Sequence, residues 1–183
     1  MSAWKFRQWF IFLFPLTASP IHIKTYNDLE LISLISEPKF RTAPFIVIKL
    51  AKARALDFSN NAVLSILNSD GAKDLVKQIS KFNRLSSINF SNCCLFNLYN
   101  EVIEILGRRL SFLNNVEELN FSNNFSCRKE SQKLECLISS LLINPKLSFS
   151  RIILTGNFVS REAAESLKDA GFTKSSLKVW ERN

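Results

Sequence analysis

The chain has 183 residues, of which 46% are hydrophobic and 22% are charged, a balance typical of a single globular domain. This composition excludes a long disordered or low-complexity region, because such regions contain too few apolar residues. The net charge is +8, of which residues 1–55 contribute +5. No nucleic-acid-binding module accompanies this charge, and pairs such as Arg108–Arg109 are too small to indicate one.

Residues 1–20 form an apolar N-terminal segment with two interpretations. Lys5 and Arg7 precede the apolar run Trp9–Leu16, and the small residues Thr17–Ser19 follow it. This is the layout of a secretory signal cleaved after Ala18. The Trp and Pro residues within the run favour instead an apolar cap or an interfacial segment, and the run is too short to span a bilayer as a helix. Mass spectrometry of the N-terminus distinguishes the two, because export predicts a mature chain that begins directly after the cleavage site.

Residues 21–50 are interpreted as an N-terminal cap or a degenerate first repeat, since terminal repeats are commonly atypical. In IHIKTYNDLELISLI, Ile21 and Ile23 fit a strand, and the apolar spacing after them fits a helix. The segment APFIVIKLAKA, residues 43–53, is then expected to form the helix before the next strand. The run Phe45–Ile48 also fits a buried strand, so both assignments remain open.

A strand-and-turn pattern occurs four times between residues 51 and 183. The copies are ARALDFSNNAV, LSSINFSNCCL, VEELNFSNNFS and FSRIILTGNFV, and they align on Asn61, Cys93, Asn124 and Asn157, at intervals of 32, 31 and 33 residues. Before each of these anchor residues, apolar and polar positions alternate as in a half-buried strand. An inward-facing Asn or Cys at this position can bind backbone groups that are freed where the strand ends. Stacked copies are therefore expected to form a ladder of anchor residues.

Each copy precedes an apolar stripe with helical spacing. The stripes run from Ala72 to Phe82, from Leu98 to Leu110, from Leu134 to Leu142 and from Ala163 to Ala170. Ser160 is predicted to cap the fourth helix, and Gly171 to end it. A last strand is predicted in SSLKVW, with Leu177 and Val179 pointing inward and no helix after it.

The pattern resembles the leucine-rich repeat, L-x-x-L-x-L-x-x-N/C-x-L, with Phe or Ile in place of several leucines. It is most similar to the ribonuclease-inhibitor-like subclass, which uses both Asn and Cys at the anchor and has a helix in each repeat. The resemblance covers residues 51–183, although the intervals exceed the roughly 20–29 residues usual for this repeat. It implies an α/β solenoid of about four to five repeats, with a curved parallel sheet on the concave side and helices on the convex side.

No catalytic or metal-binding constellation is evident. Cys94, Cys127 and Cys136 lack metal-ligand spacing such as C-x-x-C, so they are interpreted as free thiols, which favours a reducing compartment. His22 is the only histidine and lies outside the four copies, so no Cys/His or Ser/His/Asp arrangement can form within them. Glycine-rich phosphate-binding motifs are absent from the sequence. We therefore expect no catalytic activity, no cofactor and no metal.

Residues between the inward-facing positions of the strands are expected to line the concave face. Small polar residues fill this face in the first two copies, and larger charged or apolar ones follow. Exposed Trp and Arg are frequent energetic anchors of interfaces. The predicted partner-binding residues are Glu118, Asn120, Arg151, Ile153, Lys178 and Trp180. Two alternatives remain: the polar side chains merely solvate the strands, or Trp180 covers the open end of the core.

These observations predict a non-catalytic, monomeric protein-interaction module that binds another protein, and not nucleic acid, through the concave face. A small bacterial effector or adaptor in the cytoplasm of the producing cell or of a host is one form of this hypothesis. The alternative is a secreted or membrane-surface structural or recognition protein that uses residues 1–20 for export or attachment. The sequence does not identify the partner.

Overall fold

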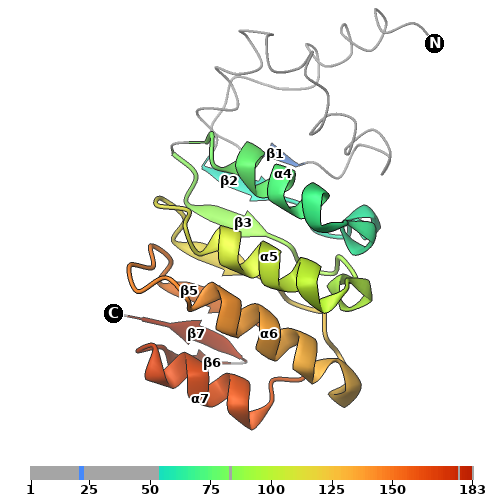
Figure 1. Cartoon of the computed structure of the whole chain (residues 1–183). Helices are drawn as coiled ribbons and strands as arrows, with labels where there is room; N and C mark the ends of the chain where they lie inside the picture. Colours follow the sequence, from blue (N-terminus) through green and yellow to red (C-terminus); the bar gives the residue numbers. More distant parts are fainter. Residues whose placement is uncertain (1–20, 23–53, 83, 177, 183) are drawn as a thin grey trace, which may run out of the picture.

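The computed structural model describes residues 21–22, 54–82, 84–176 and 178–182 of this α/β protein (Figure 1). The apolar segment 1–20, the helix of the N-terminal cap and the helix expected at 43–53 lie outside the described residues. The described part contains one seven-stranded, mostly parallel sheet with the order β1-β2-β3-β4-β5-β7-β6. None of its helices is both long and apolar enough to cross a membrane.

Five short strands form the parallel part of the sheet. They are β1 (Ile21–His22), β2 (Ala55–Asp57), β3 (Ser87–Asn89), β4 (Glu118–Asn120) and β5 (Arg151–Ile153). The buried central residues of β2 to β5 lie in register as Leu56, Ile88, Leu119 and Ile152. The predicted alignment of the four sequence copies is therefore confirmed residue by residue. Ile21 pairs with Leu56, which also confirms a strand at the start of the predicted degenerate repeat.

Helices connect successive strands from β2 to β6 and cover one face of the sheet (Figure 1). The elements are η3 (Ala62–Ile66), α4 (Ser69–Ile79), η4 (Leu95–Asn97), α5 (Asn100–Leu110), η5 (Arg128–Glu130), α6 (Ser131–Leu141) and α7 (Arg161–Asp169). All four predicted helices are confirmed. Ser160 caps α7 by accepting a hydrogen bond from the Ala163 amide, and Gly171 follows it with φ +85°. The short 3-10 helices account for part of the unusual length of each interval.

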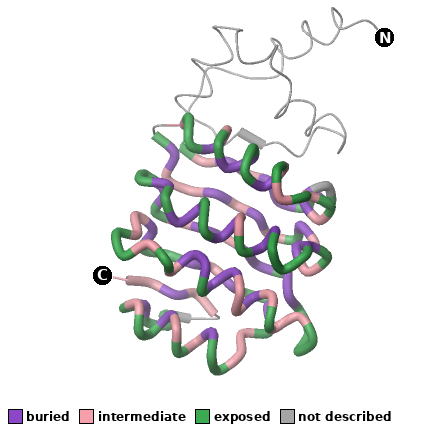
Figure 2. Tube along the Cα trace, in the orientation of Figure 1, coloured by how far each residue is buried: buried purple, intermediate pink, exposed green. Residues whose placement is uncertain are grey.

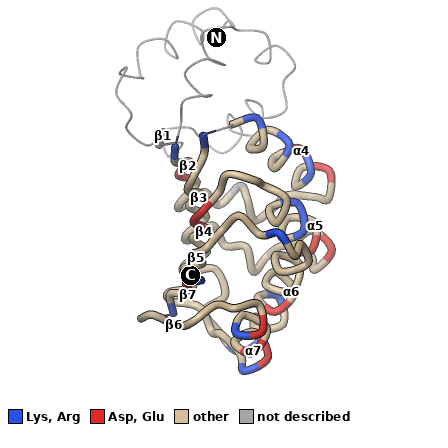
Figure 3. The backbone as a smooth tube through the Cα atoms, turned by 90° about the vertical axis from the view of Figure 1, so that its left-hand side faces the viewer, with Lys and Arg blue, Asp and Glu red and all other residues tan. Residues whose placement is uncertain are grey.

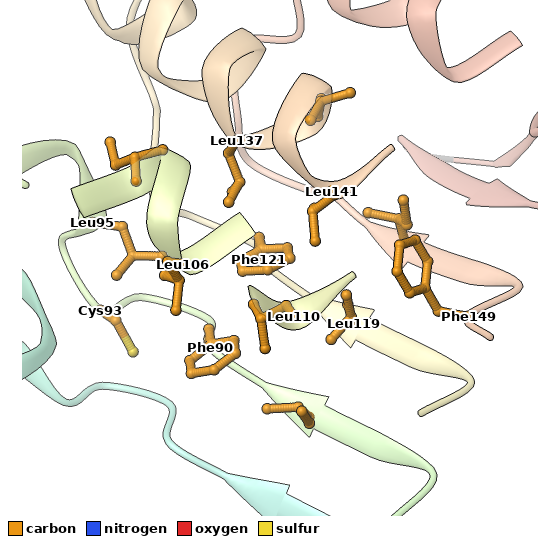
Figure 4. Close-up of a cluster of buried hydrophobic side chains, with 14 of the residues drawn as sticks. Phe90, Cys93, Leu95, Leu106, Leu110, Leu119, Phe121, Leu137, Leu141 and Phe149 are labelled. Carbon is orange, nitrogen blue, oxygen red and sulfur yellow. The ribbon is translucent and has the colours of Figure 1, made fainter. Parts of the chain in front are cut away.

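The core lies between the sheet and the helices, and aromatic rings run through it from strand to strand. Phe58 and Phe90 stack with ring centroids 5.3 Å apart, and Phe90 and Phe121 stack at 5.6 Å. Leu106 and Leu137, on α5 and α6, approach this row from the helical side (Figure 4). Figure 2 shows the resulting pattern, in which buried residues follow the strands and the sheet-facing sides of the helices.

The helices can approach one another closely because one of them carries a glycine. A Cβ at Gly107 of α5 would lie only 2.8 Å from the Ser140 Cβ of α6 and 2.9 Å from the Leu137 carbonyl oxygen. A larger residue at this position would push α5 and α6 apart.

Asn124 binds the backbone of two neighbouring units through its buried amide. Its Oδ1 accepts hydrogen bonds from the amides of Cys93 and Leu95, at 2.9 and 3.2 Å. Its Nδ2 donates to the carbonyl oxygens of Phe90 and Phe121, at 2.8 and 3.0 Å. These backbone groups lie beyond the ends of β3 and β4, where the ladder between strands stops. The anchor role predicted for Asn124 therefore has a direct physical basis.

The neighbouring anchors extend this ladder in both directions. Asn157 Oδ1 accepts from the amides of Asn124 and Phe125, at 2.8 Å each. The Cys93 thiol donates to the Phe58 carbonyl oxygen, with Sγ at 3.0 Å. Burial raises the pKa of this thiol to about 12, so Cys93 remains protonated and available as a donor at neutral pH.

A left-handed residue precedes each anchor and turns the chain away from the sheet. These residues are Asn60, Asn92, Asn123 and Gly156, with φ of 59°, 55°, 57° and 75°. Asn tolerates this conformation better than most residues, which explains the Asn-rich turns of the sequence. Glycine is required at position 156, because a Cβ there would lie 1.8 Å from the Asn123 Oδ1.

The C-terminal end of the sheet differs from the prediction. The predicted single strand SSLKVW is instead a hairpin of β6 (Thr173–Ser176) and β7 (Val179–Glu181), and β7 runs antiparallel to β5. The chain reverses near Lys178, whose φ is +63°. Trp180 lies opposite Ile152, so Trp180 is the inward residue, and the prediction that Val179 points inward is wrong. Leu177 lies outside the described residues.

We expect Phe121→Ala to lower the free energy of unfolding by about 3–5 kcal/mol, because it removes a fully buried ring from the aromatic row. Asn120→Ala is the adjacent comparison. Asn120 lies on the outward side, but its Oδ1 accepts hydrogen bonds from the Ser122 amide and hydroxyl, so we expect a smaller loss of about 0.5–1.5 kcal/mol. Equal losses in urea unfolding would contradict this assignment of inward and outward positions.

Asn124→Ala should destabilise the protein by about 3 kcal/mol or more, because several buried backbone groups lose their partner together. Gln132→Ala removes an amide of the same chemistry from an exposed site on α6, where we expect a change within about 0.5 kcal/mol. Thermal and urea unfolding measure both. A small effect at Asn124 would show that the ladder is not essential for stability.

Candidate functional site

The face of the sheet opposite the helices, here called the open face, is the candidate functional site. In Figure 3 the strands lie along one side of the molecule and the helices along the other. Two columns of side chains flank the inward residues of the strands. One column contains Ala55, Ser87, Glu118, Arg151 and Glu181, and the other contains Asp57, Asn89, Asn120, Ile153 and Val179.

A chain of polar contacts crosses four strands of the open face. Ser87 donates to Glu118, with Oγ and Oε1 3.2 Å apart, and Arg151 Nη1 lies 3.0 Å from Glu118 Oε2. On its other side, Arg151 Nε lies 3.2 Å from Glu181 Oε1. These pairs are partly exposed, so each contributes at most about 1 kcal/mol to stability. Their main effect is to hold the Arg151 guanidinium in one orientation.

Arg151 retains hydrogen-bonding capacity in this arrangement. A guanidinium presents its N–H donors in a rigid planar fork, and the contacts with Glu118 and Glu181 use Nη1 and Nε. No hydrogen bond or ion pair within the described residues involves Nη2, and the Arg151 side chain is 45% exposed. An acceptor on another molecule can therefore bind this group without displacing either glutamate.

Two apolar side chains lie beside this charged row. Ile153 of β5 and Val179 of β7 are paired across the strands, and both are half-buried. They belong to the column whose earlier members, Asp57, Asn89 and Asn120, are all polar. The open face thus combines an apolar pair with an oriented arginine at its C-terminal end.

The asparagines of the open face mainly stabilise local turns. Asn89 Oδ1 accepts from the Ser91 amide at 2.9 Å, and Asn120 Oδ1 does the same with the Ser122 amide. Asn89 Nδ2 also donates to Asp57 Oδ1 at 3.0 Å. Asn120 does lie on the predicted face, but its acceptor oxygen is already occupied.

Two of the predicted binding residues are not displayed as expected. Trp180 is only 3% exposed and belongs to the core, so the prediction of an exposed Trp is wrong. Its role is structural, but its strand lies between β5 and β6 rather than at the open end of the sheet. Lys178 lies in the turn before β7, where its Nζ donates to the Asn157 carbonyl oxygen, and Val179 takes the predicted place of Lys178 in the column. Both errors arise because the reversed strand changes which side chains face inward.

Glu181 and Val179 are the open-face residues that the sequence did not assign there. A two-residue hairpin is usually recognised by Asn-Gly, Asp-Gly or a similar turn. The turn between β6 and β7 contains no glycine, and Lys178 adopts the left-handed conformation instead. The inward–outward alternation was therefore extended through the turn as if the strand continued, which assigned Val179 and Trp180 to the wrong faces.

The cysteines and acidic residues show no reactive cluster within the described residues. All four cysteines are free: Cys93 is buried, Cys94 and Cys136 are half-buried, and Cys127 is exposed. Burial also raises the pKa of the Cys136 thiol. No group of three or more His, Cys, Asp or Glu side chains in the described part is arranged to hold a metal ion.

Comparison with known proteins does not assign this chain to a family, so its class is described by its fold. No protein-family model matches the chain, and no curated protein matches it significantly. The described residues define an α/β protein with a mostly parallel sheet and helices on one face of that sheet.

Because Trp180 is buried, we expect Trp180→Ala to destabilise the protein by about 3–5 kcal/mol, as is usual when a large aromatic side chain is removed from a core. Tyr99→Ala provides an aromatic control, since Tyr99 is 81% exposed and its loss should change stability by no more than about 0.5 kcal/mol. Differential scanning calorimetry of both variants tests this. An unchanged melting temperature for Trp180→Ala would return Trp180 to the candidate binding surface.

Proposed function

We propose that this chain is a non-catalytic protein-interaction module that binds another protein through the open face of its sheet. We further propose that its strand–helix units form a leucine-rich-repeat solenoid of the ribonuclease-inhibitor-like kind, so that the open face is the concave one. Four in-register units support this assignment, each with a buried Asn or Cys anchor after the strand.

The observation that carries the binding proposal is the pairing of an oriented Arg151 with the apolar surface of Ile153 and Val179. Arginine with free planar donors and a neighbouring apolar patch are frequent features of binding hot spots. Glu118 and Glu181 hold the guanidinium before any partner arrives. Less side-chain entropy is then lost on binding than with an unrestrained arginine.

The chemistry of this surface indicates what a partner must offer. An apolar side chain on the partner packs against Ile153 and Val179, and a carboxylate or carbonyl oxygen next to it accepts from Arg151 Nη2. Glu118 and Glu181 repel additional acidic groups on either side of the arginine. A partner segment with one acceptor and mainly neutral or basic flanks therefore fits best.

Within this proposal the module acts as a monomeric effector or adaptor in a cytoplasm, either of the producing cell or of a host. Binding requires no cofactor and no metal, and the specificity depends on the side chains of the open face. A change of residues in the two columns changes the preferred partner without altering the inward residues that stabilise the fold.

Affinity capture with the immobilised full chain, followed by mass spectrometry, identifies partners, and titration calorimetry then measures their affinity. Arg151→Ala and Ile153→Ala should each weaken binding by more than about 1 kcal/mol while the protein stays folded. Lys168→Ala on α7 and Ile66→Ala on η3 are matched controls, because they remove an exposed cation and an exposed isoleucine from other surfaces.

The controls should bind like the unmodified protein. If Arg151→Ala and Ile153→Ala bind normally while either control abolishes the complex, the open face is not the binding site. Circular dichroism and thermal unfolding of each variant separate loss of a contact from loss of the fold.

A further inference from the structure

A second surface lies where α4, α5 and α6 end and the chain returns to the sheet. This helix-exit edge comprises residues 77–82, 84–86, 108–117 and 139–150. The view in Figure 3 faces this side of the molecule, so the charged residues of the edge can be followed there. Its residues lie in the last turns of the helices and in the connections to the next strands, whereas the open-face residues lie on the strands themselves.

The helix-exit edge is strongly basic. It contains Lys77, Lys81, Arg84, Arg108, Arg109 and Lys146, and Glu117 is its one acidic residue. All of these side chains are exposed. Apart from Lys81, which donates to Gln78 Oε1, these basic side chains make no ion pair or hydrogen bond within the described part of the chain.

Helix electrostatics explain only part of this charge. Cations in the last turn of a helix interact favourably with its dipole, which accounts for Lys77 in α4 and for Arg108 and Arg109 in α5. Arg84 and Lys146 lie beyond the helices, where the dipole effect has fallen off. Their contribution to the basic edge therefore calls for a separate explanation.

Exposed apolar residues lie among these charges. Phe112 follows α5 and is 58% exposed, and Ile143 occupies the equivalent place after α6 and is 54% exposed. Between the ends of α4 and α5 is a small cavity of about 100 Å³, to which Phe82, Leu85, Phe112 and Val116 contribute apolar lining. Polar atoms make up the larger part of the cavity lining, and Asn114 and Asn115 are among the lining residues.

We propose that the helix-exit edge is a docking site for an acidic peptide segment of a partner protein. In this arrangement one apolar side chain of the segment enters the cavity and packs against Phe82 and Phe112. Carboxylates on either side of it pair with Arg84 and Arg109. An acidic protein segment fits because it meets two requirements together. It brings negative charge to the basic edge, and it can place a single apolar side chain at the cavity.

The dimensions of the site favour this occupant over others. Pockets for small molecules usually measure about 300–1,000 Å³, so a cavity of about 100 Å³ accepts a side chain rather than a whole ligand. Single-stranded nucleic acid needs several aromatic platforms along a basic groove. Here Phe112 is the one largely exposed aromatic residue of the described edge, and Glu117 lies within the same region.

The test measures binding of a fluorescently labelled peptide of glutamates around one central phenylalanine to the full chain, by anisotropy at low and moderate salt. Phe112→Ser, and separately the double change Arg84→Glu with Arg109→Glu, should each weaken binding about five-fold or more. Replacing the phenylalanine of the peptide by serine should weaken binding to a similar degree, and added salt should weaken it further.

Matched variants on other surfaces control for net charge and exposed aromatic area. Arg128→Glu with Lys129→Glu changes the net charge equally but lies on η5, and Tyr99→Ser removes an exposed ring outside this edge. Both should bind the peptide like the unmodified chain. If Phe112→Ser does not fold, as judged by thermal unfolding, the Arg84→Glu/Arg109→Glu variant and the serine-substituted peptide test the same site.

Several results would overturn the proposal. It fails if the peptide does not bind, if its phenylalanine makes no difference, or if the η5 control weakens binding as much as the edge variants. It also fails if a single-stranded oligonucleotide or vesicles with anionic lipid bind more tightly and depend on the same arginines. None of these outcomes affects the open-face proposal, which depends on Arg151 and Ile153.

Discussion

Hydrogen bonding of backbone groups beyond the strand ends is the constraint on which this structure depends. Each unit contributes only three residues to the parallel part of the sheet from β2 to β5, and the chain then turns inward over the core. The amides and carbonyls just beyond the strand would be buried without partners, at a cost of about 1–3 kcal/mol each. The side chains of Asn124, Asn157 and Cys93 meet this requirement from the neighbouring unit.

The ladder also explains how the units depend on one another. Each anchor binds the backbone of the preceding unit, so neither unit can complete its hydrogen bonds alone. Asn61 begins the described ladder, and its buried Oδ1 has no partner among the residues that the structure describes. The same interdependence appears in the row of stacked Phe rings, where each ring covers its neighbour.

The two surfaces considered for binding differ in their electrostatics. On the open face the charges are mutually paired, since Arg151 lies between Glu118 and Glu181, and selectivity there depends on shape and a few oriented donors. At the helix-exit edge most cations are unpaired within the described part of the chain, so attraction acts over a longer range and weakens with salt. The fold can carry both surfaces because the charged side chains proposed to bind, Arg151 on the open face and Arg84 and Arg109 at the edge, lie outside the core.

The sequence by itself determined the repeated part of the fold. Two local patterns surround each anchor residue: apolar and polar positions alternate before it, and apolar residues recur with helical spacing after it. Neither pattern depends on distant contacts, and both occur at Asn61, Cys93, Asn124 and Asn157. They therefore predicted the strands, the helices and their mutual register correctly. The sequence also placed Asn120 on the correct face of its strand. Its hydrogen bonds with Ser122, however, became apparent only from side-chain geometry.

Only the tertiary structure decided the C-terminal end and with it part of the candidate site. The direction of β7 depends on pairing with β5 and β6, which no local pattern specifies, and the turn at Lys178 lacks the usual glycine signal. The two-residue turn pairs Ser176 with Val179 and so shifts the inward–outward alternation by one residue, which places Trp180 in the core and Val179 and Glu181 on the open face. The ion pairs of Arg151 likewise join separate strands, so only the positions of these side chains in the assembled sheet determine them.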